Sequence, residues 1–468
     1  MARRDSGQTR HPAGSRAPHG VRAAAAWAIE RTLVTHAPVD TFLDSALAPF
    51  EPRDQGLLRE LVLGTLRWLR RIDDVMASAS HRGLADIEPA LLAPIRLAIY
   101  QLLFLDRVPA HAAVDEAVEH AAHLTHRGGA NFANALLRSV ARAPKLESWP
   151  VREADPTRRL AIELSHPDFL VERWIAAFGR ERAIAMLQAN NQPKPIQLLA
   201  FRGRGGREQL AEELIDQGLE VVPSAISPLG LTVRDGNPFA TQAFRDGAFY
   251  VQDEASQAAA LVPPPRAGER ILDAAAAPGG KTAAMHSWEP DLRLVAADRS
   301  LSRLGTLRAN LRRLRWPLQL MVGDATAPPF GGALQTASES ADFDRVVLDL
   351  PCSGTGTLRK HPELKWRISP SEIGRLAAQG EAMLDGAAPC VARGGLLIAI
   401  TCSLEPEENE LVVGRFLARR PEFRLLPLDG LLPGALERWV SGPGFWRLLT
   451  GGDHDGFTVH VMERRRAG

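Results

Sequence analysis

The segment FDRVVLDLPCSGTGTLRKHPELKW, residues 343–366, is the part of the sequence from which the C-terminal half of the chain is best interpreted. Its apolar run at residues 346–348 predicts a buried β-strand, which ends in Asp349 and is followed by Cys352. A second apolar run, LLIAI at residues 396–400, predicts another strand and is followed by Cys402. Ligands of open α/β sheets bind beyond the carboxyl ends of the strands. The two cysteines are therefore predicted to serve chemistry there, although a single free cysteine is more often a small buried hydrophobe.

A second motif, AAAAPGGKT at residues 274–282, joins a predicted strand at 270–273 to a predicted helix. Glycines let backbone N–H groups approach a ligand closely, and the N-terminus of a helix carries a partial positive charge. The sequence therefore predicts a cofactor loop, made of Ala275, Ala276, Ala277, Pro278, Gly279, Gly280 and Lys281. A loop for nucleoside triphosphates is disfavoured, because Ala275 stands where that motif requires its first glycine and because Pro278 lacks an N–H group.

Two more acidic residues follow predicted strands in the same half of the chain. Asp298 ends a strand at 294–297, and Asp324 follows a strand at 318–322. An acidic residue that follows the glycine loop by about 20 residues is typical of ribose binding. We therefore expect an adenosine-type cofactor held by Asp298, Asp324 and Asp349, with a helix N-cap as the structural alternative for each carboxylate.

Length and composition predict a multidomain protein. The chain has 468 residues, a formal net charge of +1 and three cysteines, Cys352, Cys390 and Cys402, too few for a disulfide framework. No apolar run reaches the roughly 18 residues of a membrane span, and the basic N-terminus lacks the apolar core of a secretory signal. We expect a cytoplasmic protein without a membrane segment.

The pattern of apolar residues divides the chain further. We expect a disordered basic tail at 1–21, an all-α helical domain at 22–143, a linker at 144–165, a small α/β domain at 166–255 and an α/β Rossmann-like domain with a mostly parallel sheet at 256–468. The helical domain carries arginines that either contact phosphates or form an ordinary solvated helix surface.

Several motifs together resemble the bacterial 16S ribosomal RNA cytosine-5 methyltransferases of the Sun/Fmu (RsmB) type. AAAAPGGKT resembles that family's cofactor loop, DLPCSGTGTLRKHPELKW its first cysteine motif and TCSLEPEEN its second. RDQGLLRELVLGTLRWL, in the N-terminal part, is similar to the family's NusB-like helical domain, which implies an RNA-binding role there. The chain departs from the family at Ala275, where cysteine is common, and at Thr458, where phenylalanine is common.

The resemblance implies methylation of carbon 5 of a cytosine in ribosomal RNA, most simply 16S, with S-adenosyl-L-methionine as cofactor and no metal. It implies that Cys402 adds to carbon 6 and that Cys352 assists loss of the carbon 5 proton and product release. Asp349 would hydrogen-bond the base, and Lys281 would orient the base or favour a thiolate. A predicted RNA-binding rim consists of Arg359, Lys360, His361, Lys365 and Trp366.

Other functions remain open from the residues alone. They are methylation of an exocyclic base amine, action on transfer RNA, and a non-catalytic RNA-binding or antitermination protein that uses the helical domain. Enzymes that methylate exocyclic amines usually carry an aromatic residue where Cys352 stands, and both cysteines favour catalysis. The protein is expected to act as a monomer.

Overall fold

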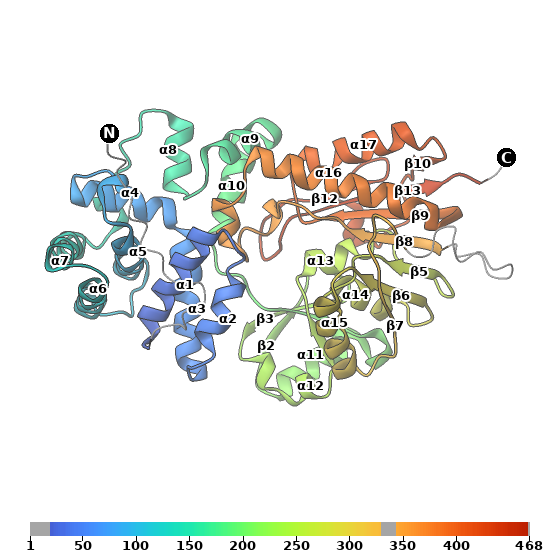
Figure 1. The fold of residues 1–468 in the computed structure, drawn as a ribbon. Helices are drawn as coiled ribbons and strands as arrows, with labels where there is room; N and C mark the ends of the chain where they lie inside the picture. Colours follow the sequence, from blue (N-terminus) through green and yellow to red (C-terminus); the bar gives the residue numbers. More distant parts are fainter. Residues whose placement is uncertain (1–18, 329–342, 467–468) are drawn as a thin grey trace. The chain divides into compact units, whose positions relative to one another are not determined.

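The computed structural model describes residues 19–328 and 343–466, which form two compact units. The N-terminal unit comprises Met1–Asn191 and His361–Arg367, and the C-terminal unit comprises Gln192–Lys360 and Ile368–Gly468. Most of the tail expected at 1–21 lies outside the described residues, and the first helix begins at Val21. Figure 1 shows the elements of each unit.

The described part of the N-terminal unit is helical. Its helices are α1 (Val21–Thr35), α2 (Asp40–Leu47), α3 (Pro52–Arg67), α4 (Leu69–Ser80), α5 (Pro89–Phe104), α6 (Ala110–Leu124), α7 (Arg127–Arg142), α8 (Pro156–Glu163), α9 (Asp168–Phe178) and α10 (Arg180–Asn190). Apolar side chains at three- and four-residue spacing, such as Leu58, Leu61 and Val62 of α3, are fully buried in its core. The predicted all-α domain is therefore confirmed as a helical bundle.

Two helix boundaries differ from those that the sequence indicates. The apolar stripe from Leu58 to Val75 spans two helices, because the chain turns at Trp68 (ψ 14°) between α3 and α4. The glycine pair Gly128-Gly129 predicts a break, yet both residues lie in the first turn of α7. The ring of His126 accepts hydrogen bonds from both glycine N–H groups and so caps that helix.

The segment between the expected domains is also helical. The linker predicted at 144–165 contains α8, whose N-terminus is capped by Asp155 and whose first residue is Pro156. Proline is well suited to the first turn of a helix, so here it begins an element instead of preventing one. Helices α9 and α10 belong to the N-terminal unit, which continues to Asn191, beyond the residue 166 at which the small domain was expected to begin.

A small antiparallel sheet opens the C-terminal unit. It contains β1 (Gln197–Ala200), β2 (Glu220–Pro223), β3 (Gly230–Asp235) and β4 (Phe249–Val251) in the order β2-β3-β1-β4, together with α11 (Gly206–Asp216) and α12 (Gln242–Arg245). The apolar runs at 196–201 and 219–222 predict strands, and β1 and β2 lie at these positions. Strand β3 was not expected from the sequence.

The larger sheet of this unit is mixed, with a parallel centre. Its strands are β5 (Arg270–Asp273), β6 (Arg293–Asp298), β7 (Gln319–Val322), β8 (Phe343–Asp349), β9 (Val391–Thr401), β10 (Phe423–Leu425), β11 (Val440–Gly442), β12 (Phe445–Leu448) and β13 (Phe457–Arg464). Their order is β11-β12-β13-β9-β8-β5-β6-β7, with β10 on β13, and the five strands from β9 to β7 in this order are parallel. A Rossmann-like sheet is therefore present.

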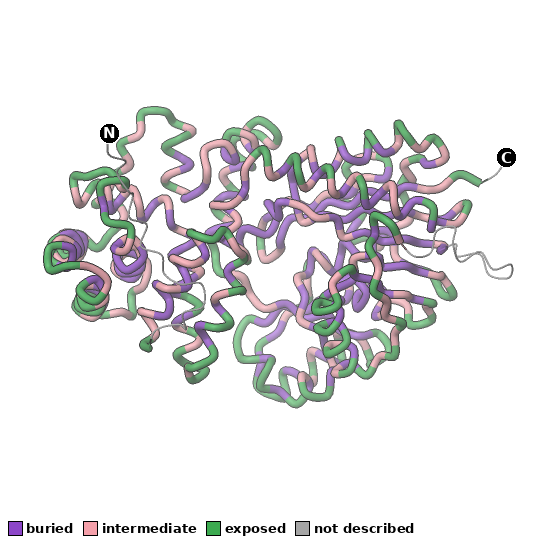
Figure 2. Tube along the Cα trace, viewed as in Figure 1, coloured by how far each residue is buried: buried purple, intermediate pink, exposed green. Residues whose placement is uncertain are grey.

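Helices cover both faces of this sheet (Figure 1). They are α13 (Glu254–Ala259), α14 (Gly280–Trp288), α15 (Leu301–Leu314), α16 (Pro370–Ala387), α17 (Glu410–Arg419) and the short α18 (Gly434–Glu437). In β8, Val346 and Leu348 pack in one hydrophobic cluster with α16 and α17, whereas Val347 packs in another with α14 and α15. Figure 2 shows these central strands as buried. The apolar run at 346–348 is thus continuous because both faces of the strand are covered.

The strand order places a ligand crevice at one edge of the sheet. Strand β5 lies between β6 and β8. After β5 the chain adds β6 and then β7 on one side of β5, and the next strand, β8, lies on the other side of β5. The chain therefore leaves the ends of β5 and β8 in opposite directions, and a crevice forms between those ends. Asp273 ends β5 and Asp349 ends β8.

Candidate active site

The two cysteines meet beyond the ends of β8 and β9. These strands are parallel neighbours with Asp349 opposite Ile400, so Cys352 and Cys402 leave the sheet at nearly the same level. Their Sγ atoms are 3.5 Å apart, and both side chains are half-buried. Two thiols from distant parts of the sequence thus share one site, as the strand-end positions predict.

Tight backbone contacts hold the two cysteine loops together. The N–H of Gly356 donates to the Cys402 carbonyl (2.9 Å), and the N–H of Gly456 donates to the Gly356 carbonyl (2.7 Å). A side chain at Gly356 would place its Cβ 2.2 Å from the Gly456 carbonyl oxygen. Glycine is required at this position because three loops meet there.

An ion-pair cluster supports the third of these loops, between β12 and β13. Lys194 forms ion pairs with Asp253 and Asp455, and the side chains of these three residues are no more than 12% exposed. The hydroxyl of Thr450 in the same loop donates to the Gly356 carbonyl at 3.1 Å. These contacts extend the support of the cysteine loops into the small sheet, and sequence reasoning did not single them out.

The segment Glu405–Asn409 does more than the helix capping that its composition suggests. The side chain of Asn409 bonds Thr401 and the carbonyls of Ser403 and Glu405. Glu408 accepts hydrogen bonds from the N–H (2.7 Å) and the hydroxyl (2.6 Å) of Ser353, the residue after Cys352. The segment therefore joins the two cysteine loops.

Lys281 and Asp349 form an ion pair beside the thiols, with Nζ 2.6 Å from Oδ2. Burial opposes the charge of Lys281, but Asp349 and an ionised Cys402 favour it, so that the pKa of Lys281 is raised. The pKa of the Cys352 thiol is raised by its hydrogen bond with Cys402 and by burial. The thiol form of Cys352 is consequently favoured.

The residues of the GKT sequence are engaged inside the protein. Lys281 pairs with Asp349, and the hydroxyl of Thr282 donates to Asp273 at 2.6 Å. A phosphate loop needs that lysine for phosphates and that hydroxyl for a magnesium ion. The structure therefore supports the sequence argument against a nucleoside triphosphate site.

A cavity opens between the ends of β5, β6, β7 and β8. It is lined by Ala274, Ala275, Asp298, Arg299, Arg303, Gly323, Asp324, Ala325, Thr326, Asp349, Leu350, Pro351, Cys352, Gln379, Met383 and Cys402. Four of the predicted cofactor residues, Ala275, Asp298, Asp324 and Asp349, thus share one cavity with both thiols.

Both outer acids also have structural partners. Asp298 is almost fully buried and accepts hydrogen bonds from the N–H groups of Ser300 and Ala277. Asp324 is exposed, and the N–H and hydroxyl of Thr326 lower the pKa of its carboxyl. Each acid therefore stabilises the chain after its strand and also presents a carboxylate to the cavity.

The rest of the predicted cofactor loop, Lys281 included, does not line this cavity. Ala276, Ala277, Pro278, Gly279 and Gly280 are not among the residues that line it. The Pro278 carbonyl accepts hydrogen bonds from Tyr250 and Asn310. Gly279 has a φ of 112°, and a Cβ there would lie 2.4 Å from Leu307. This glycine is required by the turn itself.

Two members of the predicted RNA-binding rim are buried instead, and the prediction is wrong for them. Arg359 is 4% exposed and donates to the carbonyls of Gln192, Pro193 and Gly452. Lys365, in the N-terminal unit, is 1% exposed and donates to carbonyls of Arg67 and Ser165 and to the Asn191 side chain. Both side chains donate their N–H groups to oxygen atoms inside the protein.

The other members of the rim differ in exposure. Lys360 is exposed, and His361 is half-buried near Glu363. Trp366 is half-buried, and its indole N–H donates to the Leu66 carbonyl at 2.7 Å. RNA contact by these three residues stays a prediction.

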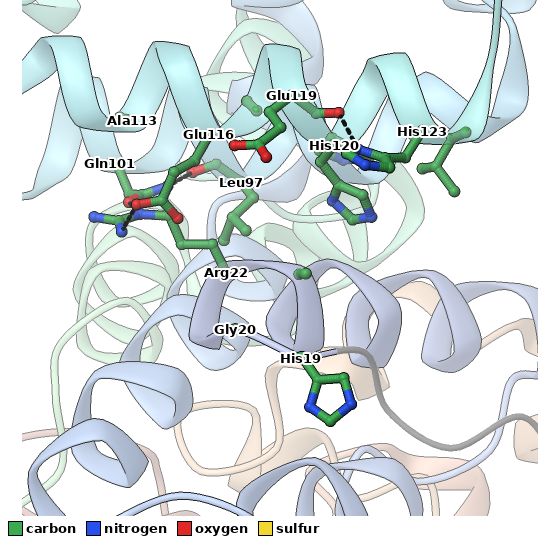
Figure 3. Close-up of a pocket in the computed structure, with 14 residues that line it drawn as sticks. His19, Gly20, Arg22, Leu97, Gln101, Ala113, Glu116, Glu119, His120 and His123 are labelled. Atoms are coloured by element: carbon green, nitrogen blue, oxygen red, sulfur yellow. Dashed lines mark hydrogen bonds and ion pairs between the residues drawn. The ribbon is translucent and has the colours of Figure 1, made fainter.

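A second cavity lies in the helical bundle, between α1, α5 and α6 (Figure 3). Arg22 closes one end by hydrogen bonds to Gln101 and Glu116, each 2.6 Å long, and His120 and His123 lie at the other end. The polar groups at the closed end satisfy one another, and no cysteine lines this cavity. The cavity beside the two thiols is therefore the better candidate for chemistry.

None of the helices in residues 19–328 and 343–466 is long and apolar enough to cross a membrane. Within the same ranges, no group of three or more His, Cys, Asp or Glu side chains is placed to hold a metal ion.

The sheet has a parallel centre and a crevice for a ligand. Two acids that follow neighbouring strands line the same cavity as the two thiols. This is the architecture of a Rossmann-like methyltransferase. Comparisons with known proteins agree. The family description "16S rRNA methyltransferase RsmB/F" matches residues 260–437, the NusB family matches 19–142, and a ferredoxin-like domain of RsmF/B-like methyltransferases matches 166–240.

Relatives that align with most of the chain identify the family. Ribosomal RNA small subunit methyltransferase B of Vibrio cholerae is 34% identical over 88% of this chain and 93% of its own length. The Pseudomonas putida protein of the same name is 35% identical over 93% of this chain and 96% of its own length. The crystal structure of PH0851 superposes with a TM-score of 0.75 at 25% identity, covering 96% of this chain and 100% of that one. The chain belongs to the RsmB family of ribosomal RNA small subunit methyltransferases.

Proposed function

We propose that this protein transfers a methyl group from S-adenosyl-L-methionine to carbon 5 of a cytosine in small-subunit (16S) ribosomal RNA. The observation that carries the proposal is the pair of thiols 3.5 Å apart, beside the Lys281–Asp349 ion pair and open to the acid-lined cavity. The names of the relatives support ribosomal RNA of the small subunit as the substrate class. The thiol pair supports carbon 5 of a pyrimidine as the atom modified, because methylation of an amine needs no covalent nucleophile.

The residues that line the cavity fit this cofactor. Asp298 and Asp324 present carboxylates, which accept hydrogen bonds from ribose hydroxyls and from an amino group. Asp273, which precedes the cavity-lining Ala274, is fully buried, and Thr282 bonds one of its oxygens. This negative charge favours a cationic ligand. When bound, S-adenosylmethionine supplies the methyl group that carbon 5 takes up.

Cys402 provides the nucleophile. Its thiolate forms a bond to carbon 6, the C5–C6 double bond opens, and its electron pair becomes available at carbon 5. Lys281 favours this step because it interacts attractively with the ionised form of Cys402. Asp349 accepts a hydrogen bond from the exocyclic amine of the base and so orients the ring, a role supported by its position at the end of β8 beside the thiols.

Cys352 provides the base that completes the reaction. While Cys402 is free, its hydrogen bond is the main reason that the pKa of Cys352 is raised. Once Cys402 is bonded to carbon 6, its sulfur carries no charge, so Cys352 releases its proton to water more easily. The Cys352 thiolate then removes the carbon 5 proton, the double bond re-forms, and the C6–S bond breaks to return the Cys402 thiolate.

Single-cysteine variants test this assignment. Cys402→Ala should neither methylate the RNA nor become covalently attached to it. Cys352→Ala should form the adduct and transfer the methyl group but resolve slowly, so an RNA-bound species that depends on S-adenosylmethionine should persist in denaturing electrophoresis.

Cys390→Ala is the matched control, because that thiol is buried in the core away from the cavity. A covalent species from Cys402→Ala and none from Cys352→Ala would reverse the two roles. Full methylation by both variants would contradict the cysteine mechanism. Bisulfite sequencing of ribosomal RNA from cells with and without the gene would identify the modified base.

A further inference from the structure

Glu408 is the one described carboxylate that hydrogen-bonds the residue following Cys352. Its two oxygens accept from the N–H and the hydroxyl of Ser353 at 2.7 and 2.6 Å, in a group that is 2% exposed. The hydroxyl of Ser353 also lies 3.3 Å from that of Ser403, the residue after Cys402. One carboxylate therefore stands between the residues that follow the two thiols.

This arrangement fixes the first cysteine loop at two atoms. A carboxylate that accepts both the N–H and the hydroxyl of one serine fixes the position and the direction of that residue, and therefore of the preceding peptide. Glu408 itself is fixed because the adjoining Asn409 is bonded to Thr401 at the end of β9. The position of Cys352 is thus set relative to the strand that carries Cys402.

Glu408 also acts on Cys352 through its charge. The groups that raise the pKa of the Cys352 thiol are Cys402, burial, Glu408 and Asp349, in that order. Burial raises the pKa of Glu408 itself to about 7, with Ser353 and Ser403 acting in the opposite direction and Glu405 in the same direction. The charge of Glu408 is consequently present mainly above neutral pH.

We propose that Glu408 is a positioning residue for the reaction: through Ser353 it holds Cys352 against Cys402, with its own carboxylate close to the Cys352 thiol. The proposal rests on the proposed function in assigning a reaction to the thiols, whereas its structural part concerns Cys352 alone. No group of the substrate or the cofactor needs to touch Glu408.

The test measures the reactivity of Cys352 directly. Full-length wild type and Glu408→Gln are alkylated with iodoacetamide between pH 6 and pH 11, and the modification of each cysteine is followed by peptide mass spectrometry. Glutamine keeps the size of the side chain and removes its charge. At a given pH above 8 the alkylation rate of Cys352 should rise about tenfold, the change that corresponds to a titration moved to lower pH by about one unit when one nearby charge is lost. The two proteins should differ little below pH 7.

Turnover gives the second readout. Loss of the positioning contact should lower kcat roughly tenfold with little change in KM for RNA, and the covalent RNA species should accumulate as it does in Cys352→Ala. Glu407→Gln, which removes a carboxylate from the same short helical turn, is the matched control and should behave as wild type. Ser353→Ala removes only the hydroxyl contact, and it should give a smaller change in the same direction if Glu408→Gln does not fold.

The outcomes separate this proposal from the proposed function. If the titration of Cys352 is unchanged in a folded Glu408→Gln protein, the positioning role is overturned, even if methylation depends on both cysteines. If Glu408→Gln does not fold, an unchanged titration in Ser353→Ala overturns it in the same way. A shifted titration supports the positioning role even if Cys352→Ala and Cys402→Ala both methylate RNA fully, a result that would overturn the cysteine mechanism instead.

Discussion

Replacement of Asp273 by asparagine should stabilise the protein and weaken cofactor binding at the same time. Asp273 ends β5 next to the cavity-lining Ala274, is fully buried, accepts a hydrogen bond from Thr282 and is attracted by the charge of Lys281. Its other oxygen lacks a well-formed hydrogen bond to any described residue. A buried carboxylate with so few partners is destabilising when ionised.

The magnitude follows from the pKa. Burial, the main cause, raises the pKa of Asp273 from 3.8 to about 6. A shift of about two units corresponds to about 3 kcal/mol of destabilisation of the ionised form in the folded state. Because the folded pKa is above the unfolded value, stability is greatest below pH 3.8 and is lost as the pH rises through about 6. Asparagine should regain on the order of 1 to 3 kcal/mol at pH 8, or about 2 to 10 °C in Tm.

Binding should change in the opposite direction. Two charges roughly 8 Å apart interact by about 2 kcal/mol at an effective dielectric constant of about 20. Loss of the carboxylate charge should therefore weaken S-adenosylmethionine, which carries a net positive charge, on the order of tenfold. Calorimetric titration at pH 8 would measure the affinity, and differential scanning calorimetry from pH 5 to pH 8 would measure Tm.

The difference in Tm between Asp273→Asn and wild type should shrink toward pH 5, where the wild-type carboxyl is mostly protonated. Thr282→Val is a control of opposite sign, since it removes the hydroxyl that stabilises the carboxylate and should lower Tm. A lower Tm for Asp273→Asn with an unchanged affinity would refute the reasoning, because the carboxylate would then serve folding and not the cofactor.

Three further predictions concern the same unit of the protein. Asp298→Ala should weaken S-adenosylmethionine by about 1 to 3 kcal/mol in calorimetry through lost ribose hydrogen bonds, and an unchanged affinity would leave its N–H contacts to Ser300 and Ala277 as its function. Hydrogen peroxide should oxidise the two thiols, whose Sγ atoms are 3.5 Å apart, to a Cys352–Cys402 disulfide with formation of water, and activity should be lost until dithiothreitol is added. Peptide mapping that found the buried Cys390 in the disulfide would contradict this. Lys360→Ala should lower the slope of log affinity for RNA against log salt by about 0.7 to 0.9, and an unchanged slope would remove Lys360 from the RNA contact.

The positions of the functional strand ends could be predicted from the sequence because they follow from topology. Apolar runs before Asp349 and Cys402 predicted the strands, and parallel strands place their carboxyl ends at one edge of the sheet. The nearness of the two thiols then required only that β8 and β9 be neighbours, as they are. The same rule brought Asp298 and Asp324 to the cavity.

Contacts made by loops followed no such rule. Asp273 was part of a predicted strand, but its isolation in the folded protein depends on what packs around the end of β5. Glu408 lies in a segment whose acids suit a helix N-terminus, and its bond to Ser353 depends on the path of a loop far away in the sequence. Hydrophobic periodicity contains no information on either contact.

The basic residues Arg359 and Lys365 also show that the contacts of a side chain could not be predicted from the sequence motif. Positive charge in a motif beside an active site suggests contact with RNA, but Lys365 and Arg359 donate to buried carbonyl groups where loops and helices end. Burial lowers the pKa of Lys365 well below its usual value, so this side chain serves as a donor more than as a charge. A motif can therefore be diagnostic of an enzyme family while some of its polar residues stabilise the fold that presents the reactive ones. In this chain the two thiols and Asp349 line the cavity, while Arg359 and Lys365 donate to carbonyl groups inside the protein.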